Sequence, residues 1–259
     1  MNITILAGRK SIMNMNIQIF GTCFVDIAKP EIRNDMISVL ADRGVASSFP
    51  KDQICCGQPA YNIGFYNEAR KAAEQLITVL YNTDTPIVSP SGSCVAMLKH
   101  GYEDLFKNDY PILKKARAVA ERTYEFSQFL EYIKADFSFL TLHARIAFHH
   151  SCHQRRILGI YDQPINILKQ IEGVETVEYE LEDRCCGFGG MYSVEYPKMS
   201  SIMAEMKAKA IIKSSAEYLV GTDAACLFTL EKALRKLKSG IRVMHLAELL
   251  AGLIKDSRK

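Results

Sequence analysis

The order of apolar and polar residues along the chain alternates between short β-prone runs and longer stretches with helical spacing. The apolar runs Ile17–Thr22 and Ile87–Ser89 predict strands, and Val45–Phe49 predicts a third. Helical spacing predicts three helices in the same half of the chain: Lys29–Asp42, Gly57–Leu80 and Val95–Leu105. Alternation of this kind predicts an α/β fold with a parallel sheet flanked by helices.

The same order of elements occurs twice, because the chain is a tandem duplication. The segment IQIFGTC corresponds to IAFHHSC, DQICCG corresponds to EDRCCG, and TPIVSPSGSC corresponds to EYLVGTDAAC. Each half then ends in an amphipathic pattern that predicts a helix, starting at Thr123 in one half and at Val243 in the other.

This duplication predicts two tandem α/β modules, each a small parallel sheet flanked by helices. We place the first module at residues 15–136 and the second at 137–259, after an N-terminal extension of residues 1–14. Residues 108–118 and 135–144 are expected to be connections, the latter joining the two modules.

Length and composition narrow the class of protein. The 259 residues are 48% hydrophobic, which suffices for one large core or two of ordinary size. A net charge of +3 gives no basic surface of the kind that binds nucleic acid. Apolar stretches such as Leu246–Ile254 are too short to span a membrane, and the N-terminal residues lack the pattern of a secretory signal. We therefore expect a cytoplasmic protein without a membrane span.

All of the cysteines belong to the duplicated pattern. Isolated cysteines in cytosolic enzymes are usually small buried apolar residues, but core filling gives no reason for every one to repeat. In a reducing compartment, ordered cysteines more often bind metal or perform redox chemistry. The eight residues form two sets of four: Cys23, Cys55, Cys56 and Cys94 in the first module, and Cys152, Cys185, Cys186 and Cys226 in the second.

Adjacent cysteines favour an iron–sulfur cluster over zinc. Zinc sites generally separate paired thiolates by two or more residues, whereas neighbouring side chains diverge and suit different corners of a cluster. The glycine after each pair allows the backbone to approach a bulky inorganic core. The outer cysteines follow predicted strands, and ligands of parallel sheets gather at the carboxyl ends of strands, so each set is expected to converge on one site.

Charged residues distinguish the second site from the first. Cations near the second set would stabilise a reduced cluster or bind a carboxylate, because arginine suits carboxylates. A solvated helix start with ordinary cations is the alternative. Adjacent Cys152 and His153 also suggest a nucleophile and a base, although adjacency alone does not supply the required geometry. The basic residues around the second site are His149, His150, His153, Arg155, Arg156 and Arg184.

The duplicated pattern Cys-x31/32-Cys-Cys-Gly-x36/38-Cys resembles that of the cysteine-rich CCG-domain proteins. These include the B subunit of heterodisulfide reductase and the iron–sulfur subunits of glycolate oxidase. Two such modules in one chain, with PSGSC in the first and SCHQRR in the second, are most similar to the lactate-utilisation protein A family. The resemblance extends from Met15 to about Ile254.

This resemblance implies an iron–sulfur electron-transfer subunit of a cytoplasmic complex that oxidises L-lactate to pyruvate. The chain would be a subunit of an oxidoreductase, an L-lactate dehydrogenase complex, rather than an enzyme by itself. Its partners would be a ferredoxin-like iron–sulfur subunit and a third subunit. The resemblance also implies that each set of four cysteines binds one cluster of the 4Fe-4S type, and it identifies no catalytic residue.

One departure from the resemblance concerns the ligand count. Heterodisulfide reductase modules end in Cys-x-x-Cys and use five cysteines for a non-cubane cluster, but Ser91 and Asp223 stand at the additional position here. A cubane with four thiolates and a non-cubane cluster with an oxygen ligand both stay open. Thiolate is the better partner for iron, which favours four sulfur ligands and argues against heterodisulfide reduction.

Two other functions agree with the cysteine pattern. A zinc-stabilised scaffold subunit would contain stoichiometric zinc and no sulfide. A thiol–disulfide redox protein using the adjacent cysteines would remain active after iron chelation, but it would leave the outer four cysteines without a role.

Overall fold

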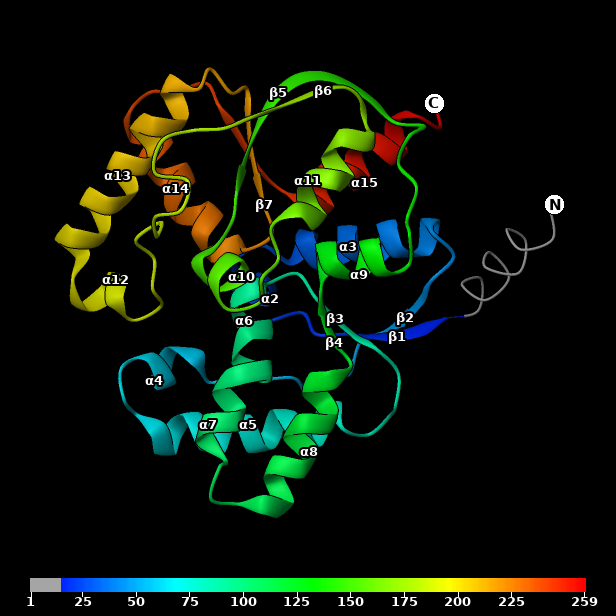
Figure 1. Ribbon diagram of the computed structural model, residues 1–259, viewed down its shortest axis with the longest axis vertical. Coiled ribbons are helices and arrows are strands. Elements are labelled where there is room, and N and C mark those ends of the chain that lie inside the picture. Colours follow the sequence, from blue (N-terminus) through cyan, green and yellow to red (C-terminus); the bar gives the residue numbers. More distant parts are fainter. Residues whose placement is uncertain (1–14) are drawn as a thin grey trace.

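The chain forms two four-stranded parallel sheets, one in each half (Figure 1). The structure is a computed structural model and describes residues 15–259, so the predicted extension 1–14 lies outside the described residues. The strand orders are β2-β1-β3-β4 and β6-β5-β7-β8, so corresponding strands occupy corresponding places. The strands are β1 (Asn16–Ile19), β2 (Ala46–Ser48), β3 (Ile87–Ser89), β4 (Thr123–Glu125), β5 (Thr141–His149), β6 (Glu172–Val177), β7 (Tyr218–Gly221) and β8 (Arg242–His245).

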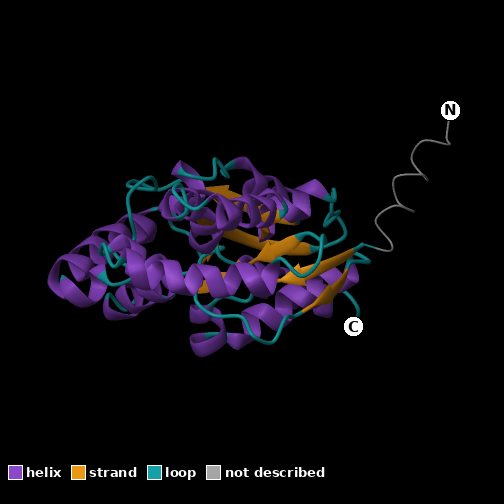
Figure 2. Cartoon of the chain, turned by 90° about the horizontal axis from the view of Figure 1, so that it is seen from below, coloured by secondary structure: helices purple, strands orange, loops and turns teal. Residues whose placement is uncertain are grey.

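Helices connect the strands and cover the sheets, as Figure 2 shows from a second direction. In the first half they are α2 (Cys23–Ala28), α3 (Pro30–Asp42), α4 (Gln58–Asn62), α5 (Tyr66–Leu80), α6 (Gly92–Ala96), the π-helical turn η1 (Met97–Gly101), α7 (Tyr102–Leu105), α8 (Tyr110–Glu121) and α9 (Phe126–Tyr132). In the second half they are α10 (Cys152–Arg156), α11 (Asp162–Gln170), α12 (Tyr192–Glu195), α13 (Pro197–Lys213), α14 (Ala224–Lys236) and α15 (Leu246–Asp256).

The predicted fold class is confirmed: two tandem α/β modules each contain a small parallel sheet flanked by helices. The apolar spacing of α3 places Ile32, Met36 and Val39 on its buried face. The strand β3 has the predicted bounds, and its residues are all buried between β1 and β4. Among the described residues, no helix has the length and apolar composition that crossing a membrane requires.

The two modules share one hydrophobic core between their sheets. Helix α3 of the first module packs against α15 of the second, and α11 of the second packs against α9 of the first. These four helices lie together on the right of Figure 1. Since α3 corresponds to α11 and α9 to α15, the contacts are reciprocal, as in the interface of a two-fold symmetric dimer. The modules are therefore related by a pseudo-two-fold arrangement.

Two further clusters cover the outer faces of the sheets. Side chains of α5 and α8 pack with Phe20 and Ile87 of the first sheet, and those of α13 and α14 pack with Ala147 and Leu219 of the second. Each sheet is thus buried on both faces, which agrees with its parallel pairing.

Several expected element boundaries are wrong. The predicted helix over 57–80 is two helices, interrupted near Gly64, whose φ is +84°. Residues 108–118 belong largely to α8, because the Asp109 carboxylate accepts a hydrogen bond from the Ile112 N–H and Pro111 lies in the first turn, where proline is tolerated. The helical patterns from Thr123 and Val243 begin instead as edge strands β4 and β8. The expected connection 135–144 already includes the start of β5 at Thr141.

Candidate functional site

The first four cysteines converge at the carboxyl end of the first sheet. Cys23 begins α2 directly after β1, and Cys94 lies in α6 directly after β3. Cys55 and Cys56 lie in the loop before α4. The Sγ atoms of Cys56 and Cys94 are 3.6 Å apart, and the thiol of Cys23 hydrogen-bonds to the sulfur of Cys55. These four residues are named the first quartet below.

The last four cysteines form a second quartet at the equivalent edge of the second sheet. Cys152 begins α10 after β5, and Cys226 lies in α14 after β7. Cys185 is hydrogen-bonded to both Cys152 and Cys186, and Cys186 is in turn hydrogen-bonded to Cys226. All eight cysteines are free of disulfides. The structure therefore brings together both sets that the spacing groups, while metal binding by them stays a prediction.

One cysteine in each quartet is poised as a thiolate. Hydrogen bonds from Cys23 and Cys56 lower the pKa of Cys55 to about 3, although burial opposes the shift. Hydrogen bonds from Cys152 and Cys186 likewise lower the pKa of Cys185 to about 2. Thiolates are the form of cysteine that ligates metal, so each quartet contains one cysteine already in the state that metal binding would require.

A glycine follows each adjacent pair because the chain has no room for a side chain there. Gly57 has a φ of +83°, and a Cβ atom on it would lie 2.8 Å from the carbonyl oxygen of Ala69. Gly187 has a φ of +92°, and its Cβ would lie 2.6 Å from the carbonyl oxygen of Ser200. Its N–H also donates a hydrogen bond of 3.4 Å to Cys185 Sγ. The glycines therefore fix the loops that present the paired sulfurs.

A cavity of about 280 Å³ lies beside the first quartet, at the boundary between the modules. Its wall includes all four cysteines of that quartet and side chains of the second module such as Phe188, Met191 and Val194. A hollow bounded by four sulfurs and mostly apolar groups suits an inorganic cluster, whose potential depends on its exclusion from solvent. The residues present thus fit an iron–sulfur group.

Ser91 and Asp223 contact one another across the module boundary. The Ser91 hydroxyl and the Ser93 N–H donate hydrogen bonds of 3.3 and 3.1 Å to the same oxygen of Asp223. These residues stand at the positions where the resemblance leaves an oxygen ligand open. Their mutual hydrogen bonding gives the carboxylate and hydroxyl a structural role, which supports sulfur coordination in both quartets.

Two buried residues accompany the second quartet. One ring nitrogen of His149 and the sulfurs of Cys186 and Cys226 lie within 4.8 Å of one another. Lys207 of α13 is 1% exposed and donates hydrogen bonds to the carbonyl oxygens of Glu182, at 3.0 Å, and Arg184. Sequence reasoning named His149 only as one of several cations and missed Lys207. An alignment of the two halves could have identified His149 and Lys207, because the corresponding positions of the first module hold apolar residues.

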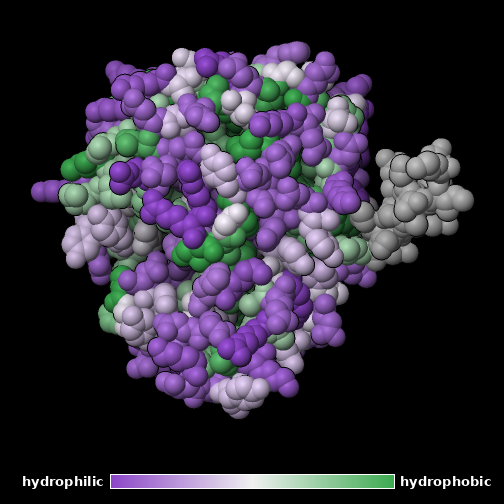
Figure 3. Space-filling view, in the orientation of Figure 1, coloured by the Kyte–Doolittle hydropathy of each residue, from purple (hydrophilic) through white to green (hydrophobic). Residues whose placement is uncertain are grey.

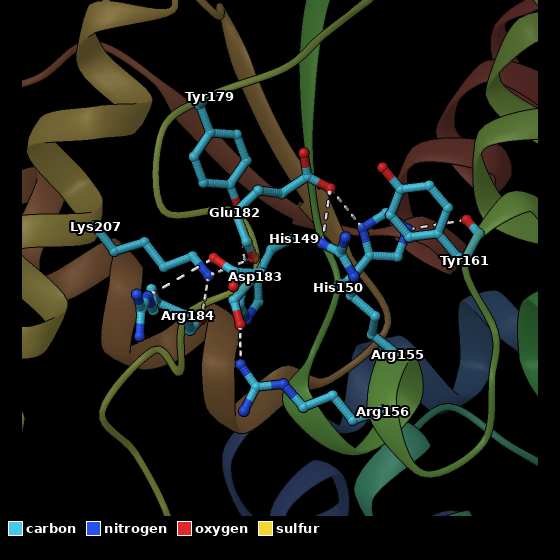
Figure 4. Close-up of polar contacts among 10 residues, drawn as sticks. All are labelled: His149, His150, Arg155, Arg156, Tyr161, Tyr179, Glu182, Asp183, Arg184 and Lys207. Carbon is cyan, nitrogen blue, oxygen red and sulfur yellow. Dashed lines mark hydrogen bonds and ion pairs between the residues drawn. The ribbon is translucent and has the colours of Figure 1, made fainter.

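The basic residues near the second quartet contact acidic and aromatic groups of the chain itself (Figure 4). His150 and Arg155 both approach Glu182, at 3.2 and 3.7 Å, and Arg155 stacks over the ring of Tyr161. Arg156 donates to the carbonyl oxygen of Asp183. These contacts give the side chains structural roles and favour the helix-start interpretation over a carboxylate site.

His153 lies close to Cys152, with its Nδ1 3.5 Å from the sulfur. The hydrogen bond to Cys185 and burial, however, raise the pKa of Cys152 well above its usual value. Cys152 is therefore a thiol rather than an activated nucleophile, and the thiolate of this quartet is Cys185.

Comparisons with known proteins agree with this architecture. The cysteine-rich domain family CCG matches residues 17–99 and again residues 146–231. The chain is 39% identical to lactate utilization protein A 2 of Bacillus cereus (strain Q1), over 92% of this chain and 98% of that protein. It is 38% identical to lactate utilization protein A of Geobacillus kaustophilus, over 91% of this chain and 98% of that protein.

A solved structure shows the same fold at low sequence identity. The crystal structure of a hypothetical protein from Helicobacter pylori superposes with a TM-score of 0.66 at 8% identity, over 98% of this chain and 55% of that one. Two matched cysteine-rich domains and relatives aligned along nearly their whole length identify the chain: it belongs to the lactate utilization protein A family of proteins with duplicated CCG domains.

Proposed function

We propose that this protein is the iron–sulfur electron-transfer subunit of a cytoplasmic complex that oxidises L-lactate to pyruvate. The observation behind the proposal is the convergence of two cysteine quartets at equivalent sheet edges, each with one cysteine held as a thiolate. The names of the relatives supply lactate as the electron donor. Eight free cysteines agree with a reducing compartment.

In this proposal the two quartets each bind one cluster of the 4Fe-4S type, which takes up and releases single electrons when bound. The chain's own residues fix the ligands, exclude water and set the local electrostatics. Gly57 and Gly187 shape the paired-cysteine loops, and Ser91 and Asp223 join the two binding regions. No described residue is assigned a part in the chemistry of lactate, which is placed in a partner.

Exposed apolar side chains support association with partner subunits. Met199, Ile202 and Met206 lie along the outer side of α13 and are each about half exposed, at 51%, 52% and 55%. Hydrophobic surface is visible at the left edge of Figure 3, where Figure 1 places α13. Half-exposed apolar side chains gathered on one helix are available for contacts with another protein. The resemblance suggests a ferredoxin-like iron–sulfur subunit and a third subunit as these partners.

The test is metal analysis and low-temperature paramagnetic resonance of anaerobically purified protein. We expect iron and acid-labile sulfide with two distinguishable reduced signals. Cys55→Ser should remove one signal and Cys185→Ser the other, so each variant is the control for its counterpart. Iron-free, colourless protein after reconstitution would refute the proposal.

Zinc is the second candidate, favoured by the nitrogen and two sulfurs of His149, Cys186 and Cys226 within 4.8 Å of one another. Mixed nitrogen and sulfur donors at such distances suit a single zinc ion in a scaffold subunit. The same metal analysis separates the candidates, because the scaffold should contain stoichiometric zinc without sulfide.

A further inference from the structure

His149 differs from its counterpart in the first module in a way that affects the second quartet. The matched segments IQIFGTC and IAFHHSC place His149 opposite Phe20. Both side chains are buried at the ends of equivalent strands, with exposed fractions of 1% and 0%. An imidazole therefore occupies a place where the fold otherwise accepts an apolar ring.

The environment of this imidazole leaves one nitrogen without a partner. Nδ1 of His149 lies 3.5 Å from the hydroxyl oxygen of Tyr179, whereas Nε2 has no hydrogen-bond partner among residues 15–259. An unpartnered buried polar atom costs about 1–3 kcal/mol. A nitrogen of this ring lies within 4.8 Å of the sulfurs of Cys186 and Cys226. A metal centre bound by the second quartet would therefore supply the partner that the nitrogen lacks.

The contacts of the ring agree with metal ligation through Nε2. Metal-ligating histidines donate their other ring N–H to an oxygen, and the Tyr179 hydroxyl oxygen is in position to accept it.

A second asymmetry acts on the same quartet. An added Cβ on Gly57 would meet Ala69, and one on Gly187 would meet Ser200, so these two residues are equivalent positions of α5 and α13. Seven residues further along each helix stand Leu76 and Lys207, both buried. The second quartet thus has a buried cation where the first has an apolar side chain, and Cys185, Cys186 and Cys226 all interact electrostatically with it.

We infer that Nε2 of His149 is an additional, nitrogen ligand of the iron–sulfur centre in the second module, beside the four cysteines of the second quartet. This inference rests on the proposed function. Imidazole is a suitable ligand for iron, and histidine ligation raises the reduction potential of iron–sulfur centres. Histidine ligation therefore gives the second centre the higher reduction potential.

The experiment is pulsed paramagnetic resonance of the reduced, reconstituted full-length protein. We expect one of the two cluster signals to show strong nitrogen coupling, and protein grown with ¹⁵N-histidine to change that coupling. In His149→Phe, which reproduces the residue of the first module, the coupling should disappear while the other signal is unchanged. His143→Phe, at an exposed position of β5, is the matched control and should retain the coupling.

A redox titration of the same samples provides the second measurement. His149→Phe should weaken reduction of that centre at least tenfold, which corresponds to about 59 mV for one electron. Two clusters without strong nitrogen coupling in the ¹⁵N-histidine comparison would overturn the inference, even if the variant failed to fold. Absence of any cluster from the unaltered protein would instead refute the proposed function, so the two failures are distinguishable.

Discussion

Glu125 is a fully buried acid at the boundary between the two modules, where it caps α9. One of its carboxylate oxygens accepts hydrogen bonds from the N–H groups of Ser127 and Gln128, at 2.9 and 3.2 Å. Burial nevertheless raises the pKa of Glu125 from 4.5 to about 7, because the hydrogen bonds compensate only part of the lost hydration. This side chain makes the stability of the protein depend on pH.

The direction of this pH dependence follows from the number of protons that the folded and unfolded states bind. Between pH 4.5 and 7 the unfolded chain ionises this carboxyl while the folded protein keeps the proton, so the free energy of unfolding falls as the pH rises. A shift of roughly 2.5 units at 1.36 kcal/mol each gives a loss of about 3 kcal/mol. Glu125→Gln keeps the capping oxygen and removes the ionisation. Relative to the unaltered protein, we expect the variant to gain about 3 kcal/mol between pH 4.5 and 7.

The assay is urea unfolding of both proteins at matched iron content from pH 4 to 8. The difference between their unfolding free energies should rise through this range and stay constant above pH 7. Glu131→Gln, at an exposed position of the same helix, should show no such rise. A constant difference between Glu125→Gln and the unaltered protein would refute the reasoning.

His245 caps α15 at the position equivalent to Glu125 and has the opposite effect. Its Nε2 lies 2.9 Å from the carbonyl oxygen of Pro90, and burial lowers its pKa from 6.5 to about 4. Since the unfolded chain binds the extra proton between these values, this group makes stability rise with pH. The two contributions oppose each other between pH 4.5 and 6.5, so Glu125→Gln should also reveal the slope due to His245.

Three further outcomes are expected. Gly187→Ala should lose the second centre in metal analysis, because the added Cβ would lie 2.6 Å from a carbonyl oxygen. Gly252→Ala in α15, where the added Cβ would have open space around it, is the control and should stabilise the protein by up to about 1 kcal/mol in urea unfolding. Lys207→Met should lower the midpoint potential of one centre in a redox titration, while Lys207→Arg should largely preserve it, because only the former removes the buried charge. Asp223→Ala should lower the unfolding free energy by about 1–3 kcal/mol, since it leaves the Ser93 N–H without its acceptor and the Ser91 hydroxyl with only the Ser93 hydroxyl as an acceptor among the described residues. An unchanged denaturation midpoint would contradict this role.

The fold class was predictable because it follows from local sequence patterns. These patterns are the alternation of strands and helices and its repetition in the second half of the chain. The grouping of the cysteines was predictable for the same reason, since residues that follow parallel strands meet at one sheet edge. Helix α8 was not, because its proline suggested a connection although Asp109 and Pro111 together start a helix. The strands β4 and β8 contain only three and four residues, and their pairing depends on neighbours far along the chain.

The packing of the two modules against each other could not be predicted from the hydrophobic periodicity of their helices. An apolar helix face indicates that the helix is buried there, but it does not indicate which element packs against it. The helices α3 and α11 both pack against helices of the opposite module. The roles of His149 and Lys207 depend on the same three-dimensional placement. Their signal was present in the sequence only as a difference between otherwise matching repeats.

The reciprocal packing of α3 on α15 and of α11 on α9 is what two separate copies of a single module would form. In such a homodimer any substitution would occur at both sites, so the two centres would be chemically identical and electrons would have no preferred direction. Fusion into one polypeptide removes that constraint while it preserves the geometry. Phe20 can then differ from His149, and Leu76 from Lys207, so that under the proposed function the two centres can differ in reduction potential within a single symmetric framework.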